Sequence, residues 1–206
     1  MTILPFLNRN IVVALSGKGR SLQNLLDQQD AFGYKVVGVI CSNSICPGLQ
    51  IAQDHKLPTF VGDYSPNKLT LTHHEQQIFL KNLKTSLIVL AGFLRKFPID
   101  PQTDPIAINI HPSLLPKYGG AGFFGMKVHQ AVFEGKETVT GATVHMVTDN
   151  YDEGAIISRA MVKLSKGDTP DDISMKVFEL EKQLLPQTIH LILEQKLPAD
   201  RVWELT

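Results

Sequence analysis

Cysteine, unbalanced charge and long apolar runs are all scarce in this sequence, and each shortage excludes a class of protein. Its two cysteines, Cys41 and Cys46, are too few for the disulfide framework of a small secreted domain, and a C-x4-C pair without nearby histidines is poor evidence for zinc. Its 20 basic residues balance 20 acidic ones, which leaves no electrostatic footprint for nucleic acid or an anionic membrane. No apolar run approaches the ~20 residues that span a bilayer, and residues 1–10 lack a signal-peptide pattern. We therefore expect a cytoplasmic protein without a metal site.

Apolar runs rich in β-branched residues alternate with segments of helical spacing, which is the pattern of an α/β fold. Strands are predicted at residues 11–15, 34–42, 57–61, 87–91, 107–110, 140–147 and 155–164, with a short edge strand at 201–205. Helices are predicted after residue 21, at 47–56, 69–84 and 126–134, and from 170 to about 193. The last long strand returns after a short connection, so we expect it to add antiparallel. The 206 residues are thus predicted to form one domain, an open, mostly parallel, twisted sheet with helices on both faces.

The third predicted helix illustrates how burial is assigned from spacing. Leu71, Ile78 and Leu83 are its apolar residues at helical spacing, so they are expected to contact the core. His73 and His74 are adjacent and cannot share one face of a helix, so both are expected to be solvated.

Residues 107–116, AINIHPSLLP, contain the chemistry around which the chain is organised. Side chains alternate between the faces of a strand, so Asn109 and His111 point the same way, at the carboxyl end of a strand where open α/β sheets bind ligands. An isolated Asn-x-His is more often a polar strand end, because single titratable residues are weak markers of function. The surrounding motifs favour the functional interpretation.

Four ordered motifs carry a resemblance to a known family. They are SGKG at 16–19, LAGFLR at 90–95, NIHPSLLP at 109–116 and DNYDEG at 149–154. Together they resemble the folate-dependent formyltransferases, specifically the branch that formylates phosphoribosylglycinamide. The similarity runs from Ile11 to about Leu193. It implies a Rossmann-like formyltransferase fold, with a nucleotide-binding half at about 10–100 and a catalytic and folate-binding half at about 101–195.

The resemblance implies transfer of a formyl group from 10-formyltetrahydrofolate, as cosubstrate, to the amine of 5-phosphoribosyl-glycinamide (GAR), a step of de novo purine biosynthesis. The catalytic residues would be Asn109, His111 and Asp152. Asn109 and a protonated His111 would donate hydrogen bonds to the oxygen that becomes negative, and Asp152 would raise the pKa of the histidine and hold its ring. Asp149 is the competing aspartate, and the following Glu153-Gly154 favours Asp152. His145 resembles a family histidine and is expected to support the site.

The strand, glycine-containing turn and helix at the amino terminus suit a phosphate, because the first amides of a helix lack internal partners. Without the other motifs, a plain strand-to-helix turn explains them as well. The resemblance assigns the GAR phosphate to Gly19, Arg20 and Ser21, although the family usually has a small polar residue and an asparagine at the last two positions. Arg20 either contacts the phosphate or faces solvent. The resemblance also assigns Glu181, otherwise a solvated helix residue, to the glycinamide end.

The folate site is likewise implied by the resemblance. It would comprise Leu94, Arg95, Lys96, Phe97, Asn109, Thr148 and Asp149. A flat heterocycle with polar edges needs apolar walls and backbone donors and acceptors, which an apolar loop after a strand provides. The glycine-rich loop at 117–125, which is longer than in the family pattern, is expected to be a mobile lid. His129, in the helix that follows, is expected to be a surface or half-buried residue.

Three alternatives remain open at this stage. A formyltetrahydrofolate deformylase would use the same three residues with water as the acceptor, and normally carries a further amino-terminal domain. A methionyl-tRNA formyltransferase would need a basic tRNA-binding domain. A catalytically silent folate- or nucleotide-binding module would not need the intact catalytic residues. We expect small-molecule partners only, with no nucleic acid and no membrane, in a monomer or homodimer.

Overall fold

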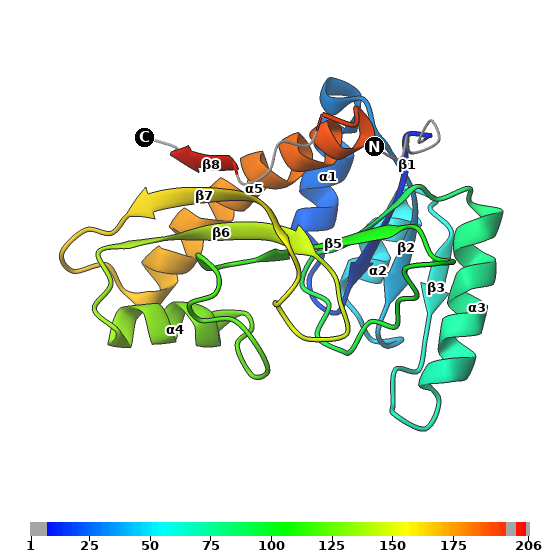
Figure 1. Ribbon diagram of the computed structural model, residues 1–206, viewed down its shortest axis with the longest axis horizontal. Helices are drawn as coiled ribbons and strands as arrows, with labels where there is room; N and C mark the ends of the chain where they lie inside the picture. Colours follow the sequence, from blue (N-terminus) through cyan, green and yellow to red (C-terminus); the bar gives the residue numbers. More distant parts are fainter. Residues whose placement is uncertain (1–7, 197–200, 205–206) are drawn as a thin grey trace.

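The computed structural model describes residues 8–196 with their side chains and residues 201–204 as backbone (Figure 1). The strands are β1 (Asn10–Leu15), β2 (Lys35–Cys41), β3 (Thr59–Val61), β4 (Leu87–Leu90), β5 (Ile106–His111), β6 (Val139–Met146), β7 (Ile156–Lys163) and β8 (Arg201–Glu204). The helices are α1 (Arg20–Phe32), α2 (Gly48–Asp54), α3 (Leu69–Asn82), α4 (Met126–Glu134) and α5 (Pro170–Leu193). Every predicted strand and helix is present, with ends displaced by a few residues.

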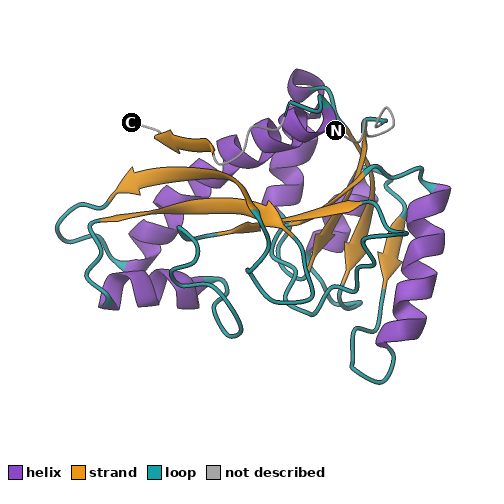
Figure 2. Cartoon of the chain, in the orientation of Figure 1, coloured by secondary structure: helices purple, strands orange, loops and turns teal. Residues whose placement is uncertain are grey.

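The strands form one sheet in the order β3-β2-β1-β4-β5-β6-β7-β8 (Figure 2). Strands β1 to β5 pair in parallel, β6 is antiparallel to both β5 and β7, and β8 is parallel to β7. This confirms the predicted α/β class, including the antiparallel addition. Strand β5 is therefore the seam at which the parallel half of the sheet meets the antiparallel half.

Helices cover both faces of the parallel half, as predicted. Alternate residues of β1 enter two separate cores: Ile11, Val13 and Leu15 enter one, and Val12 and Ala14 enter the other. The first core also contains apolar residues of α1, α2, α4 and α5, and the second contains those of α3. Strands β1 and β4 are hydrophobic on both sides because both of their faces are covered, whereas the edge strand β3 exposes Thr59 and Val61.

Helix α3 buries a different face from the predicted one. Leu71 and Ile78 are 59% and 50% exposed, so their assignment to the core was wrong. The buried residues are Thr72, Gln76 and Leu80, at a spacing of four. The spacing was helical in both cases, but two of the three buried side chains are polar.

Hydrogen bonds explain why this polar face is stable in the core. The Thr72 hydroxyl donates to the Asp63 carbonyl at 2.7 Å, and the Tyr64 hydroxyl donates to Gln76 Oε1 at 3.0 Å. Buried polar groups are tolerated when each finds a partner. Leu83, the third predicted core contact, is partly buried against the same core, as expected.

Helix α5 begins with a capping box. Thr169 accepts from the Asp172 amide, the Asp172 carboxylate accepts from the Thr169 amide, and Pro170 occupies the first turn, where its missing N–H has no cost. The helix continues through Pro186 and packs against α1, α4, β6 and β7. Figure 1 shows α5 running from α4 behind β6 and β7 and ending beside α1. It therefore connects the two halves of the domain.

Candidate active site

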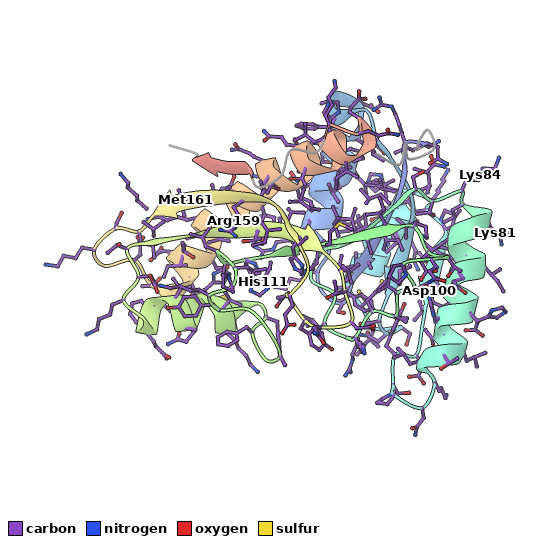
Figure 3. The ribbon with its side chains drawn as sticks, viewed as in Figure 1. Lys81, Lys84, Asp100, His111, Arg159 and Met161 are labelled. Atoms are coloured by element: carbon purple, nitrogen blue, oxygen red, sulfur yellow. The ribbon has the colours of Figure 1, made fainter. Side chains whose placement is uncertain are left out.

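A cavity of about 910 Å³ lies at the carboxyl ends of the parallel strands. Its walls are the turns after β1 and β4, the end of β5, the loop at 120–126, the loop after β6, and one face of α5. This volume is within the range of about 300–1,000 Å³ that is usual for small-molecule sites. His111 lines the cavity at the end of β5, near the middle of the molecule (Figure 3).

Asn109 and His111 leave β5 on the same side, and β6 provides a partner for the first of them. Asn109 pairs in register with His145, and Asn109 Nδ2 lies 3.0 Å from His145 Nε2. His145 Nδ1 lies 2.8 Å from the Met146 carbonyl, which can only accept, so Nδ1 carries a hydrogen. In the neutral ring, Nε2 then accepts from Asn109, which fixes the amide orientation.

Asp152 joins this group from the loop between β6 and β7. Its Oδ2 accepts from the Gly120 amide at 2.9 Å and lies 3.4 Å from His111 Nδ1. Its Oδ1 lies 3.4 Å from both Asn109 Nδ2 and His145 Nε2. Burial raises the pKa of Asp152, but the two histidine rings and the Gly120 N–H together outweigh it and hold that pKa below its ordinary value. Asp152 is therefore ionised at neutral pH.

The position of Asp152 depends on a glycine two residues later. A Cβ atom on Gly154 would lie 1.8 Å from the Met146 carbonyl oxygen, so the loop passes directly against β6. Asp152 itself has a φ of +58°, in the left-handed region that aspartate tolerates better than most residues. The Asp-x-Gly spacing in the sequence is thus a requirement of the loop geometry.

His111 is buried, and its surroundings determine its protonation. Its Nε2 lies 2.8 Å from the Tyr118 carbonyl, so Nε2 carries a hydrogen and Nδ1 is left facing Asp152. Burial lowers the pKa of His111, while the Asp152 charge and the Tyr118 carbonyl raise it without compensating fully. Asp152 raises the pKa of His111, as predicted. The expectation of a protonated ring was wrong, because burial disfavours the charged ring by more than Asp152 favours it.

The amino terminus of α1 forms one end of the cavity. Gly19 adopts a φ of +77° before the first helical turn, and Gly48 approaches it so closely that a Cβ atom on Gly19 would meet the Gly48 Cα at 3.0 Å. The exposed Arg20 guanidinium lies 4.2 Å from the centre of the Phe178 ring, a cation–π contact with α5. Glu181, one turn further along α5, also lines the cavity. Burial raises the pKa of Glu181 to about 7, and the Arg20 charge opposes this only in part.

His129 faces the same cavity from α4 and is 5% exposed, so the expectation of a surface or half-buried position was wrong. The packing of α4 against α5 encloses it. Burial, assisted by the charges of Arg20 and His111, lowers the pKa of His129 to about 4. Its ring is therefore neutral at physiological pH.

The turn after β4 forms another wall of the cavity, next to the turn after β1. Leu94, Arg95 and Lys96 are exposed along the cavity, whereas Phe97 is buried. The Leu94 amide donates to the Ser16 hydroxyl at 2.8 Å, which ties this turn to the turn after β1.

Two further contacts define the same wall. Phe97 packs edge-on against Phe93, with ring centroids 5.3 Å apart. Lys96 Nζ lies 3.6 Å from Asp149 Oδ1, so the turn after β4 meets the loop after β6 across the cavity mouth. Thr148 is exposed beside Asp149.

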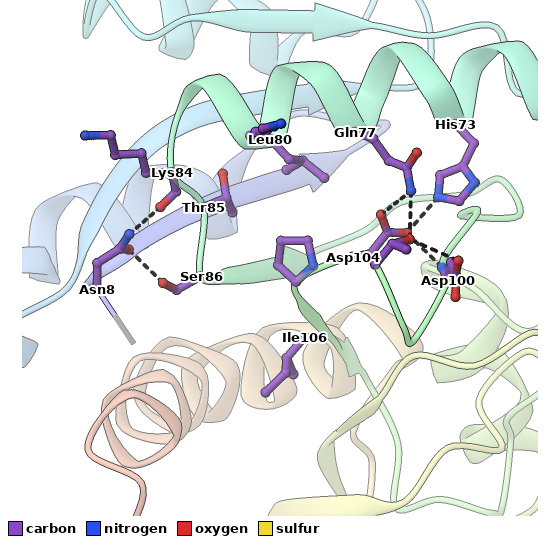
Figure 4. Close-up of a pocket in the computed structure, with 13 residues that line it drawn as sticks. Asn8, His73, Gln77, Leu80, Lys84, Thr85, Ser86, Asp100, Asp104 and Ile106 are labelled. Carbon is purple, nitrogen blue, oxygen red and sulfur yellow. Dashed lines mark hydrogen bonds and ion pairs between the residues drawn. The ribbon is translucent and has the colours of Figure 1, made fainter. Parts of the chain in front are cut away.

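A second hollow, of about 890 Å³, lies near the amino-terminal ends of β4 and β5 (Figure 4). The carboxylate of Asp104 is 1% exposed there and accepts from His73 Nε2 at 2.6 Å and from Gln77 Nε2 at 2.8 Å. His73 is therefore not solvated as predicted, because it serves as the partner of a buried carboxylate. Figure 3 shows Lys81 and Asp100, which border this hollow, well away from His111. The two hollows share no lining residue, so we assign the second to structure.

The described part of the chain offers neither a metal-binding cluster nor a membrane-spanning helix. Within residues 8–196, no group of three or more His, Cys, Asp or Glu side chains is arranged to hold a metal ion. None of the described helices has the length and apolar character that crossing a bilayer requires.

Similarity to known proteins identifies the family of this chain. The formyl transferase family model matches residues 9–189. This chain belongs to the formyl transferase family. It is 31% identical to phosphoribosylglycinamide formyltransferase of Haemophilus influenzae, over 92% of this chain and 89% of that protein. It is 29% identical to the chloroplastic enzyme of that name from Arabidopsis thaliana, over 92% of this chain and 67% of the relative.

The solved structures agree with this membership. The structure of phosphoribosylglycinamide formyltransferase from Coxiella burnetii is 32% identical, with a TM-score of 0.81, and the match covers 91% of this chain and 88% of that one. Not all relatives are of the same length. This formyl transferase spans 62% of the chloroplastic protein of Vigna unguiculata and 18% of the trifunctional purine biosynthetic protein of Bos taurus.

In this formyl transferase, the residues predicted from sequence all line one cavity. The expected catalytic residues, Asn109, His111 and Asp152, lie within 3.4 Å of one another or of shared partners. The residues expected for GAR and those expected for folate line different parts of this cavity. Their roles in catalysis and binding remain predictions.

Three contacts of this formyl transferase were missed by sequence reasoning. They are the Tyr118 carbonyl on His111, the Gly120 amide on Asp152, and the Ser16 hydroxyl between two turns. Each of the three uses a backbone atom on one side, and backbone atoms carry no side-chain signature. The Ser16 hydroxyl lies inside the SGKG motif, but nothing in its pattern indicates a partner 78 residues away.

Proposed function

We propose that this formyl transferase moves the formyl group of 10-formyltetrahydrofolate to the amine of 5-phosphoribosyl-glycinamide, giving formyl-GAR and tetrahydrofolate in de novo purine biosynthesis. The observation that carries the proposal is the cluster of Asn109, His111 and Asp152 midway along a cavity of about 910 Å³. An amine attacks the formyl carbon directly, so the protein needs to supply hydrogen-bond donors and a proton route, and no nucleophile.

Asn109 is suited to stabilise the oxygen that becomes negative as the formyl carbon turns tetrahedral. One amide hydrogen is held by His145 at 3.0 Å, which orients the group. The other points at Asp152 over a long 3.4 Å and is the one that can turn to the substrate oxygen. Removing one such donor typically costs about 2.7–4 kcal/mol of transition-state stabilisation.

His111 and Asp152 are suited to move the proton. Formyl transfer releases a proton from the attacking amine and requires one on the departing folate nitrogen. With Nε2–H held by the Tyr118 carbonyl, Nδ1 of the neutral His111 ring is free to accept the proton and then to deliver it. The ionised Asp152, 3.4 Å away, stabilises the imidazolium that forms between these two steps.

The two substrates bind to different parts of the cavity in this proposal. The phosphate of GAR lies at the amino terminus of α1, on the amides of Gly19, Arg20 and Ser21, and Glu181 contacts the glycinamide end. A helix amino terminus favours an anion through its unpaired N–H groups and dipole, and Arg20 adds a positive charge.

The folate lies against the turn after β4. The pterin would occupy the slot along Leu94, Arg95, Lys96 and Phe97. Its tail would pass Thr148 and Asp149, which line the mouth of the cavity. An apolar wall with exposed backbone groups suits a flat ring with polar edges.

The test supplies purified protein with 10-formyltetrahydrofolate, with and without GAR, and measures tetrahydrofolate and formyl-GAR. Product that requires GAR supports the proposal, whereas tetrahydrofolate formed without GAR assigns the chain to hydrolysis, the deformylase alternative. No turnover in either mixture assigns it to binding alone.

A matched pair of histidine variants tests the mechanism. His111→Ala should lower kcat by at least about 100-fold while GAR still binds, because the loss falls on the transition state. His74→Ala, at an exposed position on α3, should leave kcat unchanged. Full activity in His111→Ala contradicts the assigned role.

A further inference from the structure

Tyr118 connects the site to a carboxylate outside the cavity. Its carbonyl accepts from His111 Nε2 at 2.8 Å, and its hydroxyl donates to Glu137 Oε1 at 2.9 Å. Glu137 follows α4 and does not line the cavity. Tyr118 is therefore anchored at both ends, by its backbone carbonyl on the imidazole and by its hydroxyl on the carboxylate.

The backbone of Tyr118 is held in an unfavourable conformation. Its φ of +57° is in the left-handed region, which side chains other than glycine, asparagine and aspartate rarely adopt. Such a conformation persists only where the surroundings determine it. In Tyr118 it turns the carbonyl towards His111.

The contacts that hold Tyr118 in this conformation are made by its phenol ring and hydroxyl. Gly135 leaves room for the phenol, because a Cβ atom there would lie 2.2 Å from Tyr118 Oη. Glu137 then accepts from the hydroxyl, and Lys117 Nζ lies 2.9 Å from the same carboxylate oxygen. Both neighbours of the phenol therefore contribute to holding the tyrosine in one place.

The consequence concerns the tautomer of His111. A neutral imidazole carries one hydrogen, on either nitrogen, and a backbone carbonyl can only accept. The Tyr118 carbonyl therefore selects the Nε2–H tautomer and leaves Nδ1 as the basic nitrogen, facing Asp152. The nitrogen that exchanges a proton with the substrates is the one that faces Asp152.

We propose that Tyr118, held by Glu137, is a positioning residue that fixes which ring nitrogen of His111 takes part in the reaction. The proposal rests on the formyl transfer proposed above for its kinetic consequence. The tautomer itself is a property of the protein alone and can be measured without substrate.

The experiment compares three variants with a matched control. Tyr118→Phe removes the hydroxyl and keeps the carbonyl, Glu137→Ala removes the acceptor, and Glu137→Gln keeps an acceptor oxygen of the same length. Glu134→Gln is the control, because it neutralises an exposed carboxylate at the end of α4 that bonds only to Gln130 among the described contacts. Thermal unfolding first establishes that each variant is folded.

Two measurements are then made on each protein. Two-bond ¹H–¹⁵N spectra of the imidazole rings report the tautomer of His111, assigned by its absence in His111→Gln. Steady-state kinetics with both substrates separate kcat from the two KM values.

We expect a single Nε2–H tautomer in the wild type, in Glu137→Gln and in the control. In Tyr118→Phe and Glu137→Ala we expect both tautomers, with kcat lowered about three- to tenfold, as expected for one lost hydrogen bond, and both KM values within about twofold.

Other results overturn the proposal or separate it from the proposed function. An unchanged tautomer in Tyr118→Phe and Glu137→Ala overturns it, and so does a lower kcat without a change of tautomer, which indicates a merely structural role. If the wild type transfers no formyl group but the wild type and the variants show the expected tautomers, the proposed function is refuted and the positioning role of Tyr118 is supported.

Discussion

Replacing Glu181 with glutamine should stabilise the protein at alkaline pH and weaken its binding of the ribonucleotide. Burial raises the pKa of Glu181 from its ordinary value of 4.5 to about 7. The carboxyl group is thus protonated in the folded protein at pH values where the unfolded chain has already ionised it. A raised folded-state pKa contributes stability at low pH that is lost as the pH rises from about 4.5 through about 7.

The size of the effect follows from these two values. They differ by about 2.5, and each pKa unit corresponds to about 1.36 kcal/mol, which gives an upper limit of about 3.4 kcal/mol. Glu181 is only half-buried and retains part of its hydration, so the limit must be discounted. We expect the unfolding free energy of Glu181→Gln, relative to wild type, to increase by about 1–2 kcal/mol between pH 5 and pH 8. For a protein of 206 residues this corresponds to about 3–6 °C in the difference between the two Tm values.

Thermal unfolding of both proteins at the two pH values, at constant ionic strength, measures this difference. Glu179→Gln is the control, because Glu179 lies on the same helix, is 63% exposed and pairs with Lys182 at 2.7 Å. The control should stay within about 0.5 kcal/mol of wild type at both pH values. If the Tm difference of Glu181→Gln is the same at pH 5 and pH 8, burial does not hold the carboxyl group protonated. The same variant should bind GAR about three- to tenfold more weakly, which isothermal calorimetry measures.

Two further substitutions test the scaffold. Gly154→Ala places a Cβ atom against the Met146 carbonyl oxygen, so we expect about 2–3 kcal/mol less stability in urea unfolding and a lower kcat, because the loop that carries Asp152 must move; a normal kcat would separate that loop from catalysis. Asp104→Ala leaves the His73 ring and two other donors without their acceptor, so we expect a loss of about 2–3 kcal/mol with kcat unchanged. Activity lost without stability in Asp104→Ala would mean that the second hollow takes part in function.

The local pattern of the chain was sufficient for the strands and for one part of the site. The period of two in residues 107–111 placed Asn109 and His111 on the same side of a strand, and the structure has them there. Asp152 came from the family resemblance, because a left-handed loop residue 41 positions further along has no periodic signal. That its loop reaches the end of β5 depends on the tight fit of Gly154 against β6, which is a tertiary contact.

The misassigned residues share one physical cause. Thr72 and Gln76 are polar by sequence, and they are buried because particular partners outside the helix satisfy them. The surroundings of His73 and His129 likewise come from other segments. Asp104 is the partner of the half-buried His73, and His129 lies on α4, which packs against α5. Spacing and hydropathy indicate which face of a helix is apolar enough to be buried, but they do not indicate which polar groups will form hydrogen bonds with each other. The same limit explains why the link from Glu137 to His111 could not be predicted.

Helix α5 packs against α1 on one side of β5 and against α4, β6 and β7 on the other. Because one helix contacts elements on both sides of β5, it resists a hinge motion of the two halves about this strand. If the cavity opens for the proposed folate, we expect the movement in the loops that line it, at 92–97, 120–125 and 147–152. We expect variants that accept larger or smaller ligands to differ in the length of these three loops, while the length of α5 stays the same.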